Sequence, residues 1–355
     1  MTSLDDAAAL RAADPGRMLD AMIALPAQCR EGYAIGRATR DLPLADDVTS
    51  VAVCGMGGSA IAGDVIRALY ADRLHIPVTV VRTPELPEHC GPHALVLVSS
   101  YSGDTSETLT LFEEAIRRGC RVIAVTSGGE LARRAQESGV ALVRIPEGFM
   151  PRAAFGYLAL GALGSLEAVG LVPALSRDLD DALPKLERDL GTGGPDVAAS
   201  ENPAKALALR IVDRVPVIWG AEGIGAVAAE RWKTQFNENA KVPAFSAALP
   251  ELDHNEVVGW SEGRGDGFFL VALRHDGEHP EVAARFPLSI EIARSSGLEV
   301  EEVRAHGRSA LARLLVLVLR GDLVSTYLAL ARGVDPTPIE AIERLKRALA
   351  PARNL

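Results

Sequence analysis

The chain has 355 residues, of which 48% are hydrophobic and 24% are charged, and its formal net charge is −10. This length and composition allow a large buried core and predict two domains or one double-sized unit. The negative charge and the lack of a block rich in lysine and arginine exclude nucleic acid as an expected partner.

The cysteines and the first residues indicate the compartment. None of the four cysteines has CxxC spacing, and Cys54 and Cys120 lie in or beside apolar runs, where a reduced, buried thiol is typical. The chain opens with acidic rather than basic residues, so we expect no signal peptide. The expectation is a cytoplasmic protein.

Residues 1–45 have apolar side chains at helical spacings and predict an N-terminal helical segment. From 46 to 150, strand and helix patterns alternate. Short apolar runs predict strands at 50–54, 77–81, 94–99, 121–126 and 141–145. Helical patterns fall between them at 59–70, 105–118 and 130–137. Continuous apolar strands separated by helices are typical of a parallel sheet covered on both faces, so this region is predicted to be a doubly wound α/β domain.

Residues 151–200 are predicted to be connecting helices with a polar linker at 191–202, and 201–355 a second α/β domain. Its strands are expected at 215–219, 268–273 and 298–304. Its helices are expected at 226–236, 281–295, 309–331 and from 338 onwards. The predicted fold class is α/β, with two doubly wound subdomains whose parallel central sheets are flanked by helices.

Two apolar segments, 153–172 and 311–330, approach the length of a membrane span. Glycines and Glu167 interrupt the first, whereas Arg320 and Asp322 interrupt the second. A membrane span has a smoother apolar run, so we expect buried core or subunit-interface helices and no membrane partner.

A hydroxyl-rich turn follows the apolar run 94–98. Residues 98–108 read Val-Ser-Ser-Tyr-Ser-Gly-Asp-Thr-Ser-Glu-Thr, and a helical pattern begins at once. A strand, turn and helix in this order aim backbone N–H groups, hydroxyl groups and the positive end of the helix dipole at one point, which favours a phosphate. The alternative is an ordinary helix N-cap, which needs only one Ser or Thr.

A glycine turn at 55–60 reads Gly-Met-Gly-Gly-Ser-Ala and matches the GxGxxA fingerprint of dinucleotide sites. Such a site would need an acidic residue at the end of the second strand, where this chain has Val-Arg-Thr at 81–83. Two phosphate-type turns after neighbouring strands suit one small phosphorylated ligand better. A nicotinamide-dependent oxidoreductase is kept as an alternative.

The two turns together resemble the sugar isomerase (SIS) domain, and later motifs resemble the bifunctional phosphoglucose/phosphomannose isomerases. These motifs are Pro-Arg-Ala-Ala at 151–154, Asn-Glu-Asn-Ala-Lys at 237–241, Asp-His-Asn-Glu at 253–256, Asp-Pro-Thr-Pro-Ile at 335–339 and Leu-Lys at 345–346. The resemblance covers nearly the whole chain and implies that both subdomains are of the SIS type. One departure is Asp104, where Asn is expected, so we expect this carboxylate to point away from the phosphate.

The resemblance implies an aldose–ketose isomerase that interconverts glucose 6-phosphate or mannose 6-phosphate with fructose 6-phosphate through a cis-enediol. This reaction needs ring opening, proton transfer between C1 and C2, and a cation at the enediolate oxygen. Glu238, a carboxylate between two asparagines, is the expected base. Arg152, at the head of a helix that has no other charge until Glu167, is the expected cation. By resemblance, His254 of a neighbouring subunit opens the ring and Lys346 assists it.

The expected substrate-binding residues are small or carry a hydroxyl group: Gly57, Gly58, Ser59, Ser100, Ser102, Thr105 and Thr337. The residues of the two turns are expected to hold the phosphate. Thr337 is expected to form a wall near C3 of the sugar, because it lies in the same closing segment as Lys346. The resemblance also implies a homodimer with shared active sites.

No cofactor is expected, and no metal, because the histidine pairs at 89–93 and 275–279 fall in loops broken by glycine or proline. A competing function is an SIS-type regulator that binds a sugar phosphate without turnover. Glu238, His254 and Lys346 argue against it, since a binding protein needs no base.

Overall fold

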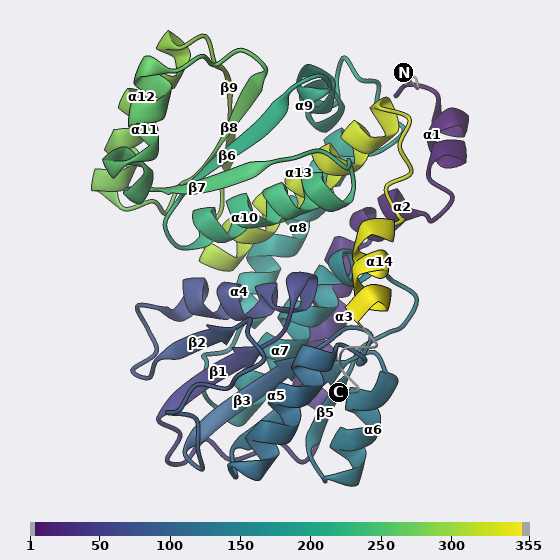
Figure 1. Cartoon of the computed structure of the whole chain (residues 1–355), viewed down its shortest axis with the longest axis vertical. Coiled ribbons are helices and arrows are strands. Elements are labelled where there is room, and N and C mark those ends of the chain that lie inside the picture. The colour runs from purple at the N-terminus through teal and green to yellow at the C-terminus, as the bar shows by residue number, and fades with distance from the viewer. Residues whose placement is uncertain (1–3, 350–355) are drawn as a thin grey trace.

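The computed structural model describes residues 4–349 (Figure 1). Its first sheet has five parallel strands in the order β2-β1-β3-β4-β5. They are β1 (Ser50–Cys54), β2 (Val78–Val81), β3 (Ala94–Ser99), β4 (Arg121–Thr126) and β5 (Ala141–Arg144). Strands β1 and β3 are buried along their whole length, as expected of continuous apolar runs in a covered parallel sheet.

Helices cover both faces of this sheet. They are α3 (Leu25–Ala38), α4 (Ile61–Tyr70), α5 (Ser106–Arg117), α6 (Gly129–Glu137) and α7 (Phe155–Val169). Val53 and Leu97 face the cluster that contains α3, α4 and α7, whereas the alternate residues Ala52 and Val96 face Phe112 of α5 and its neighbours on α6. This alternation is the predicted doubly wound arrangement.

The second sheet has four parallel strands in the order β7-β6-β8-β9. They are β6 (Val215–Ala221), β7 (Phe245–Leu249), β8 (Phe268–His275) and β9 (Glu299–Ala305). Helix α12 (Pro280–Ser295) covers one face, where Phe286 packs with Trp219. Helices α10 (Ile224–Glu238) and α13 (Ala310–Ala331) cover the other face, where Trp232 packs with Ile218. The α/β class with two parallel, helix-flanked sheets is confirmed.

Helix α13 contributes many side chains to a hydrophobic cluster that also includes side chains from both sheets. It is long and apolar enough to cross a membrane, but 94% of its most apolar window is buried inside the protein, as in a core helix. Trp232 Nε1 donates a hydrogen bond to the Leu317 carbonyl at 2.8 Å. Gly321 leaves no room for a Cβ atom beside the Trp232 ring, so α10 and α13 approach closely.

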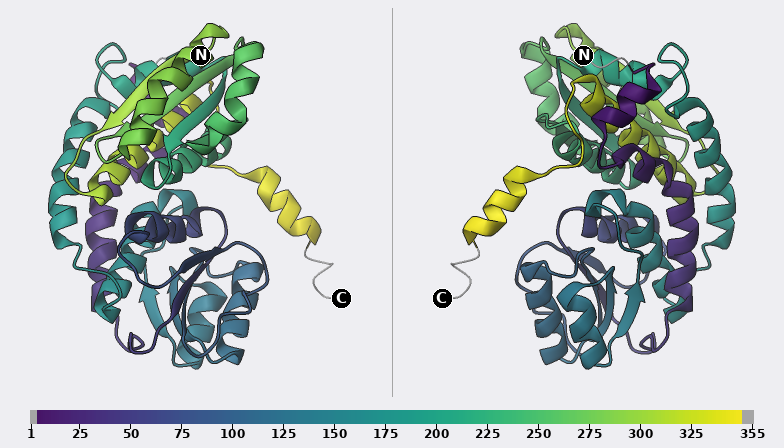
Figure 2. Two further views of the ribbon diagram at one scale, coloured as in Figure 1. Left: turned by 90° about the vertical axis from the view of Figure 1, so that its left-hand side faces the viewer. Right: turned by 90° about the vertical axis from the view of Figure 1, so that its right-hand side faces the viewer.

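The other helices are α1 (Ala7–Ala13), α2 (Met18–Ile23), α8 (Ser176–Gly193), α9 (Pro203–Ile211), α11 (Glu256–Glu262) and α14 (Glu340–Leu349). Short 3₁₀ turns lie at Gly57–Ser59, Pro151–Ala153 and Glu251–His254. Helix α14 projects from the rest of the chain, and none of its described residues is buried (Figure 2).

Three elements are missing from the sequence prediction, namely β7, α9 and α11. Strand β7 reads Phe-Ser-Ala-Ala-Leu, forms an edge of its sheet and buries only Leu249, so it has no apolar run to reveal it. Helix α8 continues to Gly193, so the first residues of the predicted linker are helical.

Candidate active site

The glycine turn and the hydroxyl-rich turn meet at one edge of the first sheet. Strands β1 and β3 pair directly, so the turns that follow them lie side by side. The backbone N–H of Tyr101 donates a hydrogen bond to the Ser59 hydroxyl at 3.0 Å, and Ser59 is buried. Ser59 therefore links the two turns as well as lying in the predicted phosphate site.

The hydroxyl-rich turn is organised by its own side chains. The Ser100 hydroxyl accepts a hydrogen bond from the Gly103 N–H at 3.2 Å and lies 3.2 Å from the Thr105 hydroxyl. Ser102 accepts from the Asp104 N–H at 3.3 Å, and its side chain is exposed. Thr105 is the N-cap residue of α5 but makes no side-chain cap hydrogen bond, so its hydroxyl is not used as an ordinary cap.

Asp104 is held away from this turn's own helix. Its carboxylate oxygen Oδ1 accepts a hydrogen bond from the Glu130 N–H at 2.9 Å, at the start of α6. The positive end of the α6 dipole therefore stabilises the charge that departs from the expected Asn.

Arg152 lies beside the glycine turn, in the 3₁₀ turn that leads into α7. Its side chain is 3% exposed. A Cβ atom at Gly58 would lie 3.2 Å from the Arg152 Cα, so glycine allows this close approach. The structure thus places Arg152 next to Gly57, Gly58 and Ser59.

The Arg152 guanidinium reaches the end of α10. Nε donates to Asn239 Oδ1 at 2.7 Å, and Nη1 lies 3.5 Å from Glu238 Oε2. Burial lowers the pKa of Arg152, and the neighbouring Glu238 carboxylate opposes this shift. A guanidinium stays protonated in proteins, so a fixed cation lies beside the expected base.

The second terminal nitrogen of Arg152 holds a distant loop. Nη2 donates to the carbonyls of Pro336 and Thr337 at 2.7 and 2.9 Å. The Thr337 hydroxyl is buried without a described hydrogen-bond partner, and its side chain packs against Gly16, where a Cβ atom would clash. The structure therefore brings Thr337 to Arg152 through its backbone, while its side chain faces the N-terminal segment.

A buried polar network beneath the site was not found by sequence reasoning. Arg231 donates to both carboxylate oxygens of Asp322 at 3.0 and 2.7 Å, and also to the Arg152 carbonyl at 3.0 Å. Asn239 donates to the Ser325 hydroxyl at 3.0 Å. The signal in the sequence was Asp322 itself, a carboxylate inside a long apolar helix. Such a residue needs a partner when buried.

His254 and Lys346 are not brought to this cluster within one chain. His254 is exposed at the end of the Glu251–His254 turn, and Lys346 is exposed on α14. Within residues 4–349, neither side chain shares a hydrogen bond or ion pair with Glu238 or Arg152. Of the two asparagines beside Glu238, Asn237 donates to the Val242 carbonyl and Asn239 accepts from Arg152.

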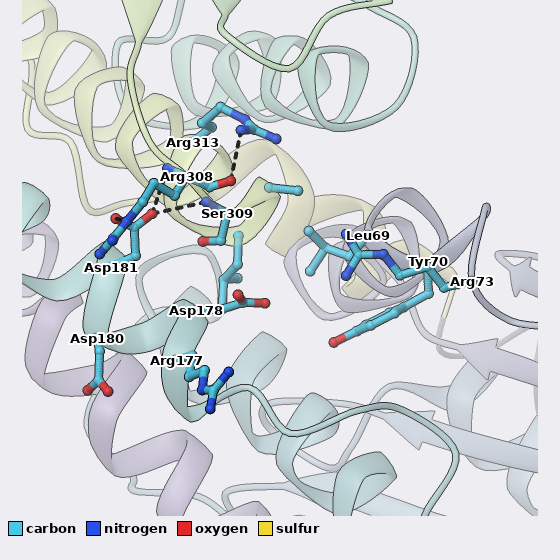
Figure 3. A pocket seen from close by; sticks show the side chains of 12 residues that line it. Leu69, Tyr70, Arg73, Arg177, Asp178, Asp180, Asp181, Arg308, Ser309 and Arg313 are labelled. Atoms are coloured by element: carbon cyan, nitrogen blue, oxygen red, sulfur yellow. Dashed lines mark hydrogen bonds and ion pairs between the residues drawn. The ribbon is translucent and has the colours of Figure 1, made fainter.

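A separate cavity of about 480 Å³ lies between α4, α8 and the start of α13 (Figure 3). Its charged lining residues are Arg73, Arg177, Arg308, Arg313, Asp178, Asp180 and Asp181. Asp181 accepts hydrogen bonds from the Arg308 and Ser309 N–H groups, just before the first residue of α13. The opposite charges nearly balance, and the cavity contains none of the predicted site residues.

In the part of the chain that the structure describes, no three His, Cys, Asp or Glu side chains are grouped to hold a metal ion. His275, from one of the loop pairs, is buried at the end of β8, and burial lowers its pKa to about 4.

Comparisons with known proteins agree with this architecture. Residues 200–349 match the family described as the bacterial phospho-glucose isomerase C-terminal SIS domain. The crystal structure of a hypothetical protein from Thermus thermophilus superimposes with a TM-score of 0.76 and 18% identity, over 97% of this chain and 93% of that one. At this identity, the match supports the fold alone.

Two curated relatives are closer in sequence. The bifunctional phosphoglucose/phosphomannose isomerase of Caldicellulosiruptor bescii is 36% identical over 339 residues, which cover 95% of this chain and 100% of the relative. The protein of the same name from Aquifex aeolicus is 37% identical over 311 residues, covering 86% and 93%. The chain therefore belongs to the bifunctional phosphoglucose/phosphomannose isomerase family.

Proposed function

We propose that this protein is an aldose–ketose isomerase that interconverts glucose 6-phosphate or mannose 6-phosphate with fructose 6-phosphate. The observation that carries the proposal is the 3.5 Å approach of the buried Arg152 guanidinium to the Glu238 carboxylate, next to the glycine turn. A base, a fixed cation and a phosphate-type turn are the groups that enediol chemistry on a sugar phosphate requires.

In this reaction Glu238 removes the proton from C2 of the open-chain aldose and returns it to C1, which gives the ketose. The intermediate is a cis-enediol, and its developing oxygen charge is stabilised by Arg152. Arg152 is held by Asn239, Pro336 and Thr337 before substrate arrives, so little reorganisation is needed. Glucose and mannose phosphates share this enediol, so one base serves both.

The phosphate is bound by Gly57, Gly58 and Ser59 of the glycine turn and by the hydroxyl-rich turn at the start of α5. Ser102 is exposed and the Thr105 hydroxyl makes no cap hydrogen bond, so both are available to an anion. The N-terminal end of α5 adds its dipole. The backbone of Thr337, which Arg152 holds, limits the space near C3 of the sugar, because the Thr337 side chain packs against Gly16.

Ring opening is assigned to His254 and Lys346, which act once a second subunit completes the site. Exposure of both side chains in a single chain supports this proposal. Three apolar side chains on the elements around His254 are also exposed, and a dimer interface would cover them: Phe245 at 56%, Val258 at 61% and Leu288 at 63%. The proposed assembly is a homodimer with shared active sites.

The test of the function is an assay that starts from fructose 6-phosphate and measures glucose 6-phosphate and mannose 6-phosphate separately. Both products are expected from the wild type, with and without prior dialysis against EDTA. Glu238→Gln should still bind substrate but lose about 10²–10⁴-fold in turnover, the usual scale for a general base. Glu230→Gln, on the exposed side of the same helix, is the control and should remain active.

The shared site is tested by subunit exchange. Mixing inactive Glu238→Gln and His254→Ala chains should regenerate active sites in heterodimers. Tight sugar-phosphate binding without any product would instead identify a regulator. Failure of the mixture to recover activity, despite demonstrated exchange, would place both groups on one chain.

A further inference from the structure

Lys241 is a charged residue of the Asn-Glu-Asn-Ala-Lys motif that the proposed chemistry does not use. It follows the end of α10 and has a left-handed backbone conformation, with φ of +56°. Glycine adopts this conformation without strain and is the common residue at such helix ends. A lysine at this position suggests that its side chain is needed.

The Lys241 ammonium group contacts two segments that are far apart in the sequence. Nζ lies 2.5 Å from the Glu238 carbonyl oxygen and 3.5 Å from that of Asn239, both at the end of α10. It also donates to the Pro336 carbonyl at 3.0 Å. The first two contacts are ordinary for a cation at a helix C-terminus, but the third joins this helix end to the loop before α14.

We propose that Lys241 is a positioning residue that ties the Glu238 end of α10 to the Asp335–Thr337 loop. The tie fixes the position of the segment from which α14, the helix that carries Lys346, begins. This inference rests on the proposed function, because it concerns the alignment of the base and the ring-opening lysine.

Arg152 and Lys241 hold the same carbonyl. Arg152 Nη2 lies 2.7 Å from the Pro336 oxygen that also accepts from Lys241. The Arg152 side chain contacts Glu238 at the same time, so the base, both cations and the loop form one connected unit. Helix α14 buries none of its described residues, which leaves this loop to set the direction in which the helix departs.

The charges that face Lys241 make the tie sensitive to pH. Arg152 opposes its positive charge, whereas Asp335 and Glu238 favour it. Although part of the side chain is exposed, desolvation of the ammonium group and then Arg152 lower the pKa of Lys241 to about 8. The full set of charge-assisted contacts is therefore present below pH 8 and weakens as the pH rises through this value.

The experiment compares Lys241→Gly, Lys241→Met and Lys241→Arg with the wild type. Lys241→Gly removes the tie while relieving the backbone strain, so its melting temperature should be unchanged or higher. Lys233→Met, which removes a lysine paired with Glu230 on the same helix, is the matched control and should behave as the wild type.

For Lys241→Gly and Lys241→Met we expect kcat to fall by about 10- to 100-fold, the scale of a small misplacement of reacting groups, with KM for fructose 6-phosphate nearly unchanged. Amide hydrogen exchange in residues 335–349 should increase. The decline of kcat above about pH 8 in the wild type should disappear in both variants, and Lys241→Arg should restore part of the activity.

Unchanged kcat in Lys241→Gly would overturn the proposal, as would lower activity without faster exchange at 335–349. A decline in activity that follows the melting temperature would reduce Lys241 to a structural role and also overturn it. If the wild type makes no product, the isomerase assignment fails, but the exchange measurement still tests the tie itself.

Discussion

Gly58 packs against the backbone of Arg152, so closely that a Cβ atom at Gly58 would lie 3.2 Å from both the Arg152 Cα and its nitrogen. This contact joins the phosphate-type turn to the cation beside Glu238. A shift in the backbone of the glycine turn therefore moves Arg152, and with it the reacting end of the site, even when no substrate is bound.

Gly58→Ala tests this contact. The new methyl group must displace the Arg152 backbone by a few tenths of an ångström, so kcat should fall by up to about 100-fold while the fold is retained. The measurement is kcat together with the melting temperature. Gly91→Ala is the control, because a Cβ atom there meets no atom within 4 Å. Equal activity of both variants would mean that Arg152 has room to adjust.

Ser102→Ala and Thr105→Ala should mainly raise KM for the sugar phosphates. Hydrogen bonds to a charged group contribute about 1.5–3 kcal/mol each, so an increase of roughly 10-fold or more is expected per variant. The inhibition constant of inorganic phosphate should rise in parallel. Thr110→Ala, whose hydroxyl donates to the Ser106 carbonyl farther along α5, should leave both quantities unchanged. If KM stays constant in both variants, the phosphate binds elsewhere.

Asp322→Ala should be strongly destabilising. The side chains of Asp322 and Arg231 are 2% and 3% exposed, and loss of one partner leaves an uncompensated buried charge. The expected loss in the free energy of unfolding is about 3–5 kcal/mol, measured by denaturant titration. The double variant Arg231→Met/Asp322→Leu should recover much of this loss, because no lone charge remains. Stability of the single variant close to the wild type would contradict the buried pair.

His275 should make the protein less stable in mild acid. Burial holds its pKa at about 4 rather than 6.5, and its Nε2 is buried without a described partner. Between pH 6.5 and 4 the unfolded chain therefore binds a proton that the folded chain does not, so the free energy of unfolding falls with decreasing pH. The loss approaches about 3 kcal/mol. In His275→Gln the free energy of unfolding should depend less on pH than in the wild type. His89→Gln, which changes an exposed histidine, is the control and should keep the pH dependence of the wild type. The same pH dependence in both variants would contradict this prediction.

The sequence predicted the sheets and the turns more fully than the site. The strands of the first sheet are continuous apolar runs, and the hydroxyl-rich turn precedes α5 as expected. By contrast, nothing local shows that Arg152 meets Asn239 and Pro336, because these contacts arise from packing between distant segments. The roles of His254 and Lys346 stay predictions, since both lie exposed on a single chain.

The burial of α13 has a consequence for synthesis of the protein. Ile218 and Val271, on the inner face of the second sheet, belong to the same apolar cluster as α13, yet residues 310–331 are made after every strand of that sheet. While the chain is still on the ribosome, this face has α10 but lacks α13, the second of its two covering helices, and the apolar surface that α13 later buries promotes self-association. The nascent chain therefore needs protection until α13 emerges, and a chain terminated before residue 310 should aggregate rather than fold.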